Sequence, residues 1–136
     1  MDLSHGLMLC GTTVLGVLGA IHLLFTYRGN RLEPRDPALR AAMERSWLVI
    51  TRQTTVWRAG KGFNASHSLG LIALALVYGH LAVMQPQALA ASPFLSGLGL
   101  AVLLAYLALA WRYFFSVPFR WMAFACAIYA VGWALQ

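Results

Sequence analysis

Four long apolar runs, separated by short polar connections, make up most of the chain. A helix that crosses a membrane needs about 20 apolar residues. The runs that meet this requirement cover about residues 7–27, 65–84, 94–115 and 118–135. They hold no acidic residue, and their two arginines lie near run ends, where a long side chain can reach the interface. This pattern predicts an all-α fold, a four-helix transmembrane bundle that forms one integral membrane domain over residues 1–136.

The connection between the first two runs has a periodic pattern of its own. Asp36 followed by Pro37 is typical of a helix start, because aspartate caps a first turn and proline fits its first position. Apolar side chains then recur every three or four residues as far as Trp57, while basic residues lie off this stripe. The pattern predicts an amphipathic helix over about residues 37–57. We expect this helix to lie at the membrane interface, in the first cytoplasmic loop.

Composition and charge agree with a membrane protein. Charged residues make up 10% of the chain, whereas a soluble domain has roughly 25%. A net charge of +6 can indicate nucleic acid, but eight of the ten Lys and Arg residues lie in the first connection and the other two flank the third. Loops rich in these residues face the cytoplasm. We therefore expect no nucleic-acid partner, an integral protein of the bacterial inner membrane, and both termini on the non-cytoplasmic side.

Small residues recur at helical spacing in two of the runs. Gly97, Ala101 and Ala105 are four residues apart, and so are Gly16 and Ala20. Small side chains at this spacing let helix backbones approach closely in lipid. Such contacts form within one chain or between chains. Besides the lipid membrane itself, we therefore expect a homo-oligomer or membership of a larger membrane complex.

Polar side chains gather where the runs meet the basic side. His22 and His67 fall at similar depths in the first two runs, and Asn64 precedes the second. Arg112 and Tyr113 end the third run on the same side. An ionisable residue inside a membrane is by default a hypothesis for a functional site. We expect these five residues to bind a ligand; a purely structural hydrogen bond between the histidines is the alternative.

Few other groups point to chemistry, and we assign no catalytic residue. Catalytic triads and hard-metal centres need carboxylates, which the runs lack, so no metal site is predicted. Cys10 and Cys126 have no metal-binding or disulfide spacing. A single b-type haem between His22 and His67 stays open as an alternative, and the cofactor is otherwise unknown. Enzymatic activity is undecided, with the absence of catalytic carboxylates favouring a non-catalytic role.

Two resemblances bear on function. The four-helix topology and basic first loop are similar to the MAPEG proteins, membrane transferases and isomerases that use glutathione. Arg58 and Asn64 stand near the positions of that family's basic residue and asparagine, but its following glutamate and proline are absent. The resemblance implies a glutathione-dependent enzyme in which Arg58, Asn64 and Arg112 bind the thiol cofactor. The segment 62–70 resembles small bacterial four-helix membrane proteins of unknown function.

These observations favour one function over its alternatives. We expect a small polytopic membrane protein that is a non-catalytic accessory subunit, or that binds a lipid or small apolar ligand at the cytoplasmic-side polar cluster. The MAPEG-like enzyme and the single-haem cytochrome are the alternatives.

Overall fold

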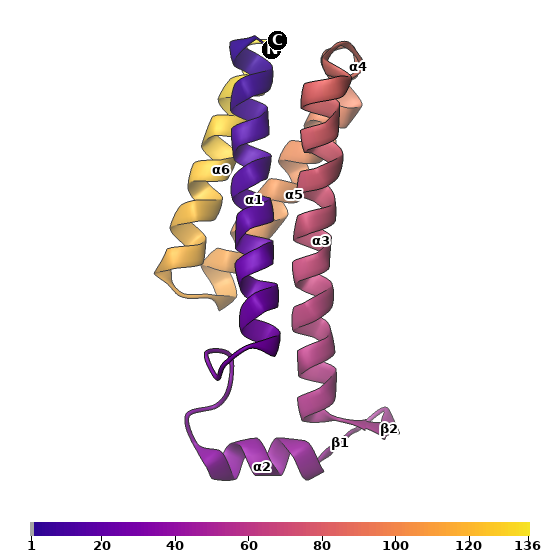
Figure 1. Ribbon diagram of the computed structural model, residues 1–136, viewed down its shortest axis with the longest axis vertical. Coiled ribbons are helices and arrows are strands. Elements are labelled where there is room, and N and C mark those ends of the chain that lie inside the picture. Colours follow the sequence, from indigo (N-terminus) through magenta and orange to yellow (C-terminus); the bar gives the residue numbers. More distant parts are fainter. Residues whose placement is uncertain (1) are drawn as a thin grey trace. The chain divides into compact units, whose positions relative to one another are not determined.

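The computed structural model describes residues 2–136, and these are mostly helical (Figure 1). The elements are α1 (Leu3–Tyr27), α2 (Pro37–Arg45), β1 (Trp47–Leu48), β2 (Thr51–Thr55), α3 (Val56–Met84), α4 (Pro86–Ala90), α5 (Pro93–Tyr113) and α6 (Ser116–Ala134). Four of these helices, α1, α3, α5 and α6, are long and apolar enough to cross a membrane. The four predicted apolar helices are confirmed, and they indicate a membrane protein.

The chain divides into two compact units. The first unit contains residues 2–18 and 71–136, and the second contains Gly19–Gly70. Helices α1 and α3 each contribute one part to both units, whereas α4, α5 and α6 belong to the first. The second unit contains α2 and the two strands.

Small residues allow the helices of the first unit to approach closely. A Cβ atom added at Gly11 of α1 would lie 2.9 Å from the backbone oxygen of Ala125 on α6. One added at Gly132 of α6 would lie 2.7 Å from a backbone oxygen of α1, and one at Gly16 would lie 2.8 Å from the Cβ of Ala75 on α3. Glycine is therefore needed for the close contacts of α1 with both α6 and α3.

Two buried tyrosines occupy the space beside Gly99 of α5. The Tyr78 hydroxyl donates to the backbone oxygen of Leu95 at 2.8 Å, and the Tyr129 hydroxyl donates to that of Ser96 at 3.2 Å. A Cβ atom at Gly99 would lie only 2.2 Å from the Tyr129 oxygen. The tyrosines thus link α3 and α6 to α5 through side-chain hydrogen bonds, in a place where no side chain on α5 fits.

Of the predicted small-residue positions, Gly16 makes a close contact within the chain, and contacts of the others with a second chain stay a prediction. Ala101 and Ala105 are exposed on the surface of this unit. A Cβ atom at Gly97 would meet Trp133 only at 3.4 Å, an ordinary contact. Gly99 makes the close approach on α5, because the rings of Tyr78 and Tyr129 pack against the helix face that carries Gly99.

Helix α2 begins as predicted but ends twelve residues before the predicted helix does. The Asp36 carboxylate accepts a hydrogen bond from the backbone N–H of Ala38 at 2.8 Å, and Pro37 occupies the first turn. The helix ends at Arg45 because Ser46 has extended backbone dihedrals, while its hydroxyl and N–H both donate to the carbonyl of Ala42. The predicted amphipathic helix over residues 37–57 is therefore wrong beyond Arg45.

A two-stranded antiparallel hairpin replaces the rest of that helix. Strand β1 pairs with β2, with Trp47 opposite Thr55 and Leu48 opposite Thr51. Residues 49–55 contain five β-branched side chains, which favour extended backbone over helix. The apolar spacing resembled a helical stripe, but residue type decides the local structure here.

Helix α3 begins at Val56, nine residues earlier than the predicted start at residue 65. The Thr55 side chain caps it by accepting a hydrogen bond from the backbone N–H of Arg58 at 3.3 Å. Gly60 and Gly62, read from sequence as part of a connection, lie inside the helix, and a Cβ atom at either would meet nothing within 4 Å. The short helix α4 was not predicted. The predicted ends at Tyr27 and Met84 are correct, and the other ends of the long helices differ from prediction by one to four residues.

Candidate functional site

Two histidines from different helices meet in the second unit. The rings of His22 on α1 and His67 on α3 contact each other edge to face, with centroids 5.4 Å apart and an interplanar angle of 74°. Asn64 lies one turn before His67 on the same helix face, because residues three apart are neighbours on a helix. Its side chain lies close enough to the His22 ring to interact with it. The structure thus brings together three of the five residues predicted to bind a ligand.

One nitrogen of this cluster has no partner. Among the residues that the structure describes, Nε2 of His22 is a buried side-chain polar atom without a hydrogen bond. A buried polar atom of this kind is uncommon in folded proteins and needs an explanation. A ligand or a water molecule that donates to or accepts from Nε2 would supply the missing hydrogen bond.

The hydroxyl groups around the histidines are engaged with their own helices. Thr26 donates to the backbone oxygen of His22 at 2.8 Å, and Ser68 donates to that of Asn64 at 2.9 Å. Ser66, next to His67 in sequence, donates to the backbone oxygen of Phe63 at 2.9 Å. Serine and threonine commonly bond in this way inside helices. None of these three hydroxyls is oriented by an imidazole as a nucleophile would be.

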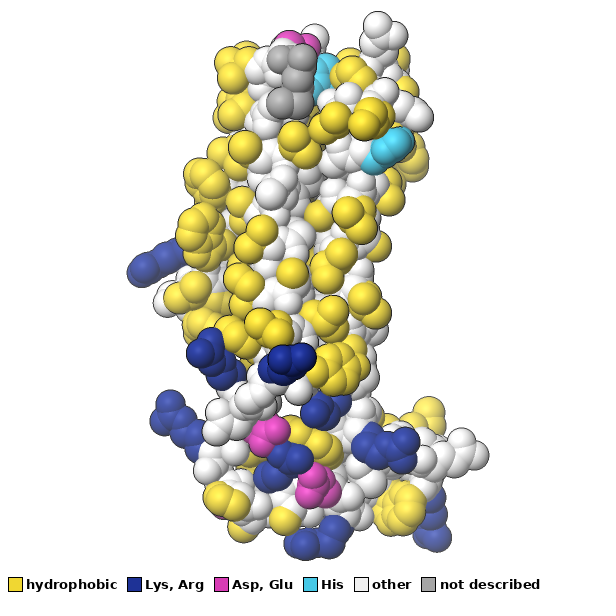
Figure 2. Space-filling view, viewed as in Figure 1, with side chains coloured by type: hydrophobic (Ala, Val, Ile, Leu, Met, Phe, Trp, Pro, Cys, Tyr) yellow, Lys and Arg dark blue, Asp and Glu magenta, His cyan; other side chains and the backbone are white. Residues whose placement is uncertain are grey.

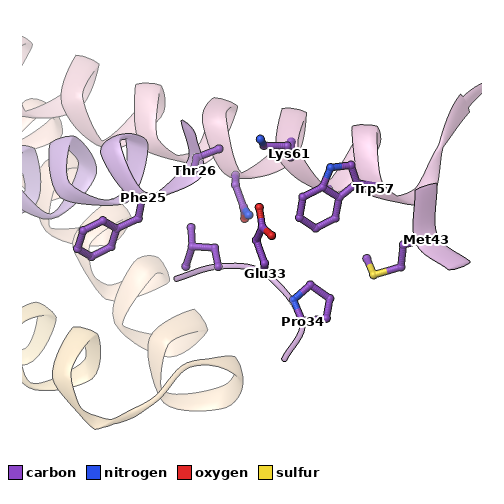
Figure 3. Close-up of a pocket in the computed structure, with 10 residues that line it drawn as sticks. Phe25, Thr26, Glu33, Pro34, Met43, Trp57 and Lys61 are labelled. Carbon is purple, nitrogen blue, oxygen red and sulfur yellow. The ribbon is translucent and has the colours of Figure 1, made fainter. Parts of the chain in front are cut away.

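A cavity of about 230 Å³ lies beside this cluster (Figure 3). It is lined by Phe25, Thr26, Leu32, Glu33, Pro34, Met43, Trp57, Gly60, Lys61 and Asn64. These residues come from the end of α1, the following connection, α2 and the first turns of α3. Asn64 belongs both to the cavity wall and to the histidine cluster, so the two features are continuous.

Arg40 of α2 holds the connection against α3. Its guanidinium lies over the Trp57 ring, 3.7 Å from the ring centroid. It also forms ion pairs with Glu33 and, at 2.8 Å, with Glu44. Figure 3 shows the Glu33 carboxylate pointing from the connection towards α3, between Thr26 and Trp57. A cation on an aromatic face adds to the ion pairs, so this wall of the cavity is fixed by one side chain.

Lys61 is the cation that lines the cavity. Its ammonium nitrogen lies 5.7 Å from the ring centroids of both Tyr27 and Trp57. Figure 2 shows many Lys and Arg side chains in dark blue on the visible face of the part of the chain that holds α2 and the hairpin. The cavity therefore opens within a strongly basic part of the chain.

The remaining two predicted site residues lie in the first unit. Arg112 and Tyr113 end α5, are both exposed, and contact each other, with the Arg112 guanidinium 5.5 Å from the Tyr113 ring centroid. Their role as ligand-binding residues stays a prediction.

Sequence reasoning missed four residues that shape the cavity: Glu33, Arg40, Trp57 and Lys61. A signal for two of them was present, because Trp57, Lys61 and Asn64 follow one another at steps of four and three. That spacing places side chains on one helix face. The predicted helix began only at residue 65, so these three residues were not placed on one helix face.

A second polar cluster lies at the start of α1, in the first unit. Asp2 Oδ1 lies 2.5 Å from Nδ1 of His5 and accepts a hydrogen bond from the Ser4 hydroxyl at 2.9 Å. The other ring nitrogen of His5 lies 3.0 Å from the backbone oxygen of Pro86. The three residue types resemble a catalytic triad, but the serine donates to the carboxylate and Nε2 faces a carbonyl. The arrangement serves to cap α1 and tie it to α4.

The same contacts alter the acidity of Asp2. The backbone N–H of His5 and then its side chain donate to the carboxylate, with Ser4 adding a weaker contribution. Hydrogen bonds to the charged form favour ionisation. They lower the pKa of Asp2 from 3.8 to about 2.

The geometry limits the chemistry available at the histidine pair. Two axial histidines hold a haem between their rings. The edge-to-face contact of His22 with His67 leaves no plane between the rings for a macrocycle, so it does not favour that alternative. No three His, Cys, Asp or Glu side chains within residues 2–136 form a group that could hold a metal ion. The site as built offers hydrogen bonds, one cation and an apolar wall.

Comparisons of the chain with protein families, with curated proteins and with solved structures each find no match.

Proposed function

We propose that this small polytopic membrane protein is not an enzyme and binds a lipid or another small apolar ligand in the cavity beside Asn64. The cavity carries the proposal, because it combines apolar and aromatic walls with a few polar groups. Binding sites for small molecules have this composition. In this proposal Asn64 and His22 form the polar end of the site, and His67 orients His22 through ring contact.

The state of the polar groups supports binding rather than catalysis. Three nearby hydroxyls donate to backbone oxygens, and Glu33 is paired with Arg40. General acid–base catalysis needs a group within hydrogen-bonding reach of the substrate and able to exchange a proton. Nε2 of His22, which has no partner, is suited to complete a hydrogen bond to a bound ligand.

The proposal includes an orientation in the membrane. The cavity lies among the eight basic residues of the first connection, and such connections face the cytoplasm. We place the cavity on the cytoplasmic side of the bacterial inner membrane, with α2 at the interface and both termini on the opposite side. Alkaline phosphatase fused after Gln136 should then be active, and the same enzyme fused after Arg45 should be inactive.

A pair of glycine variants tests the binding site. Gly60 lines the cavity and Gly62 does not, yet both lie in the same part of α3, and a Cβ atom added at either would meet no atom within 4 Å. Gly60→Leu should fill the cavity without disturbing the fold, and Gly62→Leu is the matched control. The measurement is native mass spectrometry of the protein, purified in mild detergent and titrated with a lipid extract from the host membrane.

The outcomes separate binding in the cavity from binding elsewhere. We expect stoichiometric lipid adducts on the natural protein and on Gly62→Leu, and their loss in Gly60→Leu. Equal adducts on both leucine variants would overturn the proposal, because the cavity would then not be the binding site. If the protein instead forms adducts with glutathione, and Gly60→Leu does not change them, the glutathione-dependent enzyme is favoured over the lipid binder.

A further inference from the structure

The acidic side chains of the second unit are all engaged. Residues 19–70 contain eight Lys or Arg side chains but only three acidic ones, Glu33, Asp36 and Glu44. Glu33 and Glu44 both pair with Arg40, and Asp36 caps α2. No carboxylate of this unit is therefore left to neutralise another cation.

Lys61 is the cation that this shortage affects inside the cavity. Within residues 2–136 no carboxylate oxygen lies within 4.0 Å of its ammonium nitrogen, whereas Glu33, the acid that lines the same cavity, is held by Arg40. The Lys61 ammonium is flanked by the rings of Tyr27 and Trp57. The cavity thus presents one uncompensated positive charge beside the side-chain amide of Asn64.

Cationic ligands are disfavoured by the same contacts. An aromatic ring that recognises a quaternary ammonium group needs a free face. Arg40 already lies over Trp57, and Lys61 lies near both Trp57 and Tyr27. The chain's own cations therefore occupy the positions that a ligand cation would take.

We infer that the cavity selects an anionic amphiphile, whose negatively charged head binds Lys61 and whose apolar part lies along Phe25, Leu32 and Met43. This inference rests on the proposed function and names the ligand class for it. A cavity of about 230 Å³ is small beside the roughly 300–1,000 Å³ of typical ligand pockets. It holds a head group and the beginning of a chain, and the rest of the chain extends into the bilayer.

Three single-chain lipids with the same acyl chain test the charge preference. Lysophosphatidylglycerol is anionic, lysophosphatidylcholine is zwitterionic and monoacylglycerol is neutral. We expect lysophosphatidylglycerol to bind about tenfold more tightly than the other two, the effect of one charge-assisted hydrogen bond. Inorganic phosphate forms a fourth arm, which separates recognition of a lipid from recognition of a free anion. Binding is measured by native mass spectrometry in neutral detergent.

Charge variants assign the preference to Lys61. Lys61→Gln should abolish the preference and Lys61→Arg should retain it, because arginine keeps the charge. Arg52→Gln is the matched control, since Arg52 is an exposed cation of strand β2 that does not line the cavity. It removes the same net charge from the same unit and should leave the preference intact.

Several results would overturn the inference. If the three lipids bind equally well and Gly60→Leu abolishes the binding of each, the charge preference is refuted. The proposed binding function then still stands. Equal effects of Arg52→Gln and Lys61→Gln show that surface charge, not the cavity, attracts the lipid. Phosphate that binds as tightly as the lipid refutes an amphiphile as ligand. Lipid binding that Gly60→Leu does not alter refutes the proposed function as well.

Discussion

Replacing Gly99 by alanine tests the packing of the first unit at its closest contact. The added methyl group would lie 2.2 Å from the Tyr129 oxygen and 2.7 Å from Cε1 of Tyr78. Both rings are buried, and both hydroxyls donate to backbone oxygens of α5, at Leu95 and Ser96. The rings cannot move away from the methyl group without loosening these hydrogen bonds.

The expected cost follows from these contacts. Overpacking a well-packed core costs about 1–3 kcal/mol. Each side-chain hydrogen bond in a membrane protein contributes about 0.6 kcal/mol, so weakening both adds about 1 kcal/mol. We therefore expect Gly99→Ala to lower the free energy of unfolding by roughly 2–4 kcal/mol relative to a glycine-to-alanine change without a clash.

Gly97→Ala supplies that reference. Gly97 lies two residues away on α5, and a Cβ atom there meets Trp133 only at 3.4 Å. Both substitutions gain the same helix propensity, so their difference isolates the clash. The assay is equilibrium unfolding of the purified protein in mixed micelles with increasing SDS, followed by circular dichroism.

The double variant Gly99→Ala/Tyr129→Phe provides a further check. Removing the Tyr129 hydroxyl eliminates the 2.2 Å contact but leaves those at 2.7 and 2.8 Å, so stability should recover in part. The two changes should therefore be non-additive. If Gly99→Ala unfolds within about 0.5 kcal/mol of Gly97→Ala, the close approach of these helices is refuted, because surface substitutions span that range.

Three further predictions concern polar groups. Arg40→Gln should weaken the contact with Trp57 and the ion pairs, and so raise hydrogen exchange in α2 but not in α6; unchanged exchange in α2 would contradict this. Asp2 has a pKa of about 2, lowered from 3.8 chiefly by the backbone N–H of His5, so its stabilising effect is complete above about pH 4 and is lost as the pH falls towards 2. The difference in unfolding midpoint between the natural protein and Asp2→Asn should disappear over that interval, and a difference that disappears above pH 4 would refute the lowered pKa. Ser96→Ala should cost about 0.6 kcal/mol by removing a buried side-chain hydrogen bond, measured by the same SDS unfolding, and stabilisation would contradict it.

The four apolar helices could be predicted because a high mean hydropathy over about 20 residues indicates a segment that lies in lipid. The exchange of a few residues within such a segment does not alter that mean. The hairpin could not be predicted from apolar spacing, because the stripe that ends at Trp57 satisfies a helical period by coincidence. The β-branched residues 49, 50, 51, 54 and 55 carried the contrary signal, and their preference for extended backbone prevails.

The candidate site was predictable in part for a similar reason. Depth counted from the basic side places His22 and His67 at one level, and the structure does bring their rings into contact. The pairing of Arg40 with Glu33 joins a helix to an irregular connection, and no periodic pattern describes such a contact. The choice of Gly99 over Gly97 depends on tyrosines from two other helices, which a single helix pattern does not contain.

The hairpin and the early start of α3 together account for the position of the proposed site. Because β2 ends at Thr55, the helix is already formed at Trp57 and runs unbroken through Gly60 and Gly62. An unbroken helix places Trp57, Lys61 and Asn64 on one face at steps of four and three. A connection at residues 57–64, as the predicted helix start at residue 65 implied, would not align the Lys61 cation with the Asn64 amide. The same residues that end the predicted amphipathic helix therefore create the combination of aromatic ring, cation and amide on which the proposed selectivity for an anionic head depends.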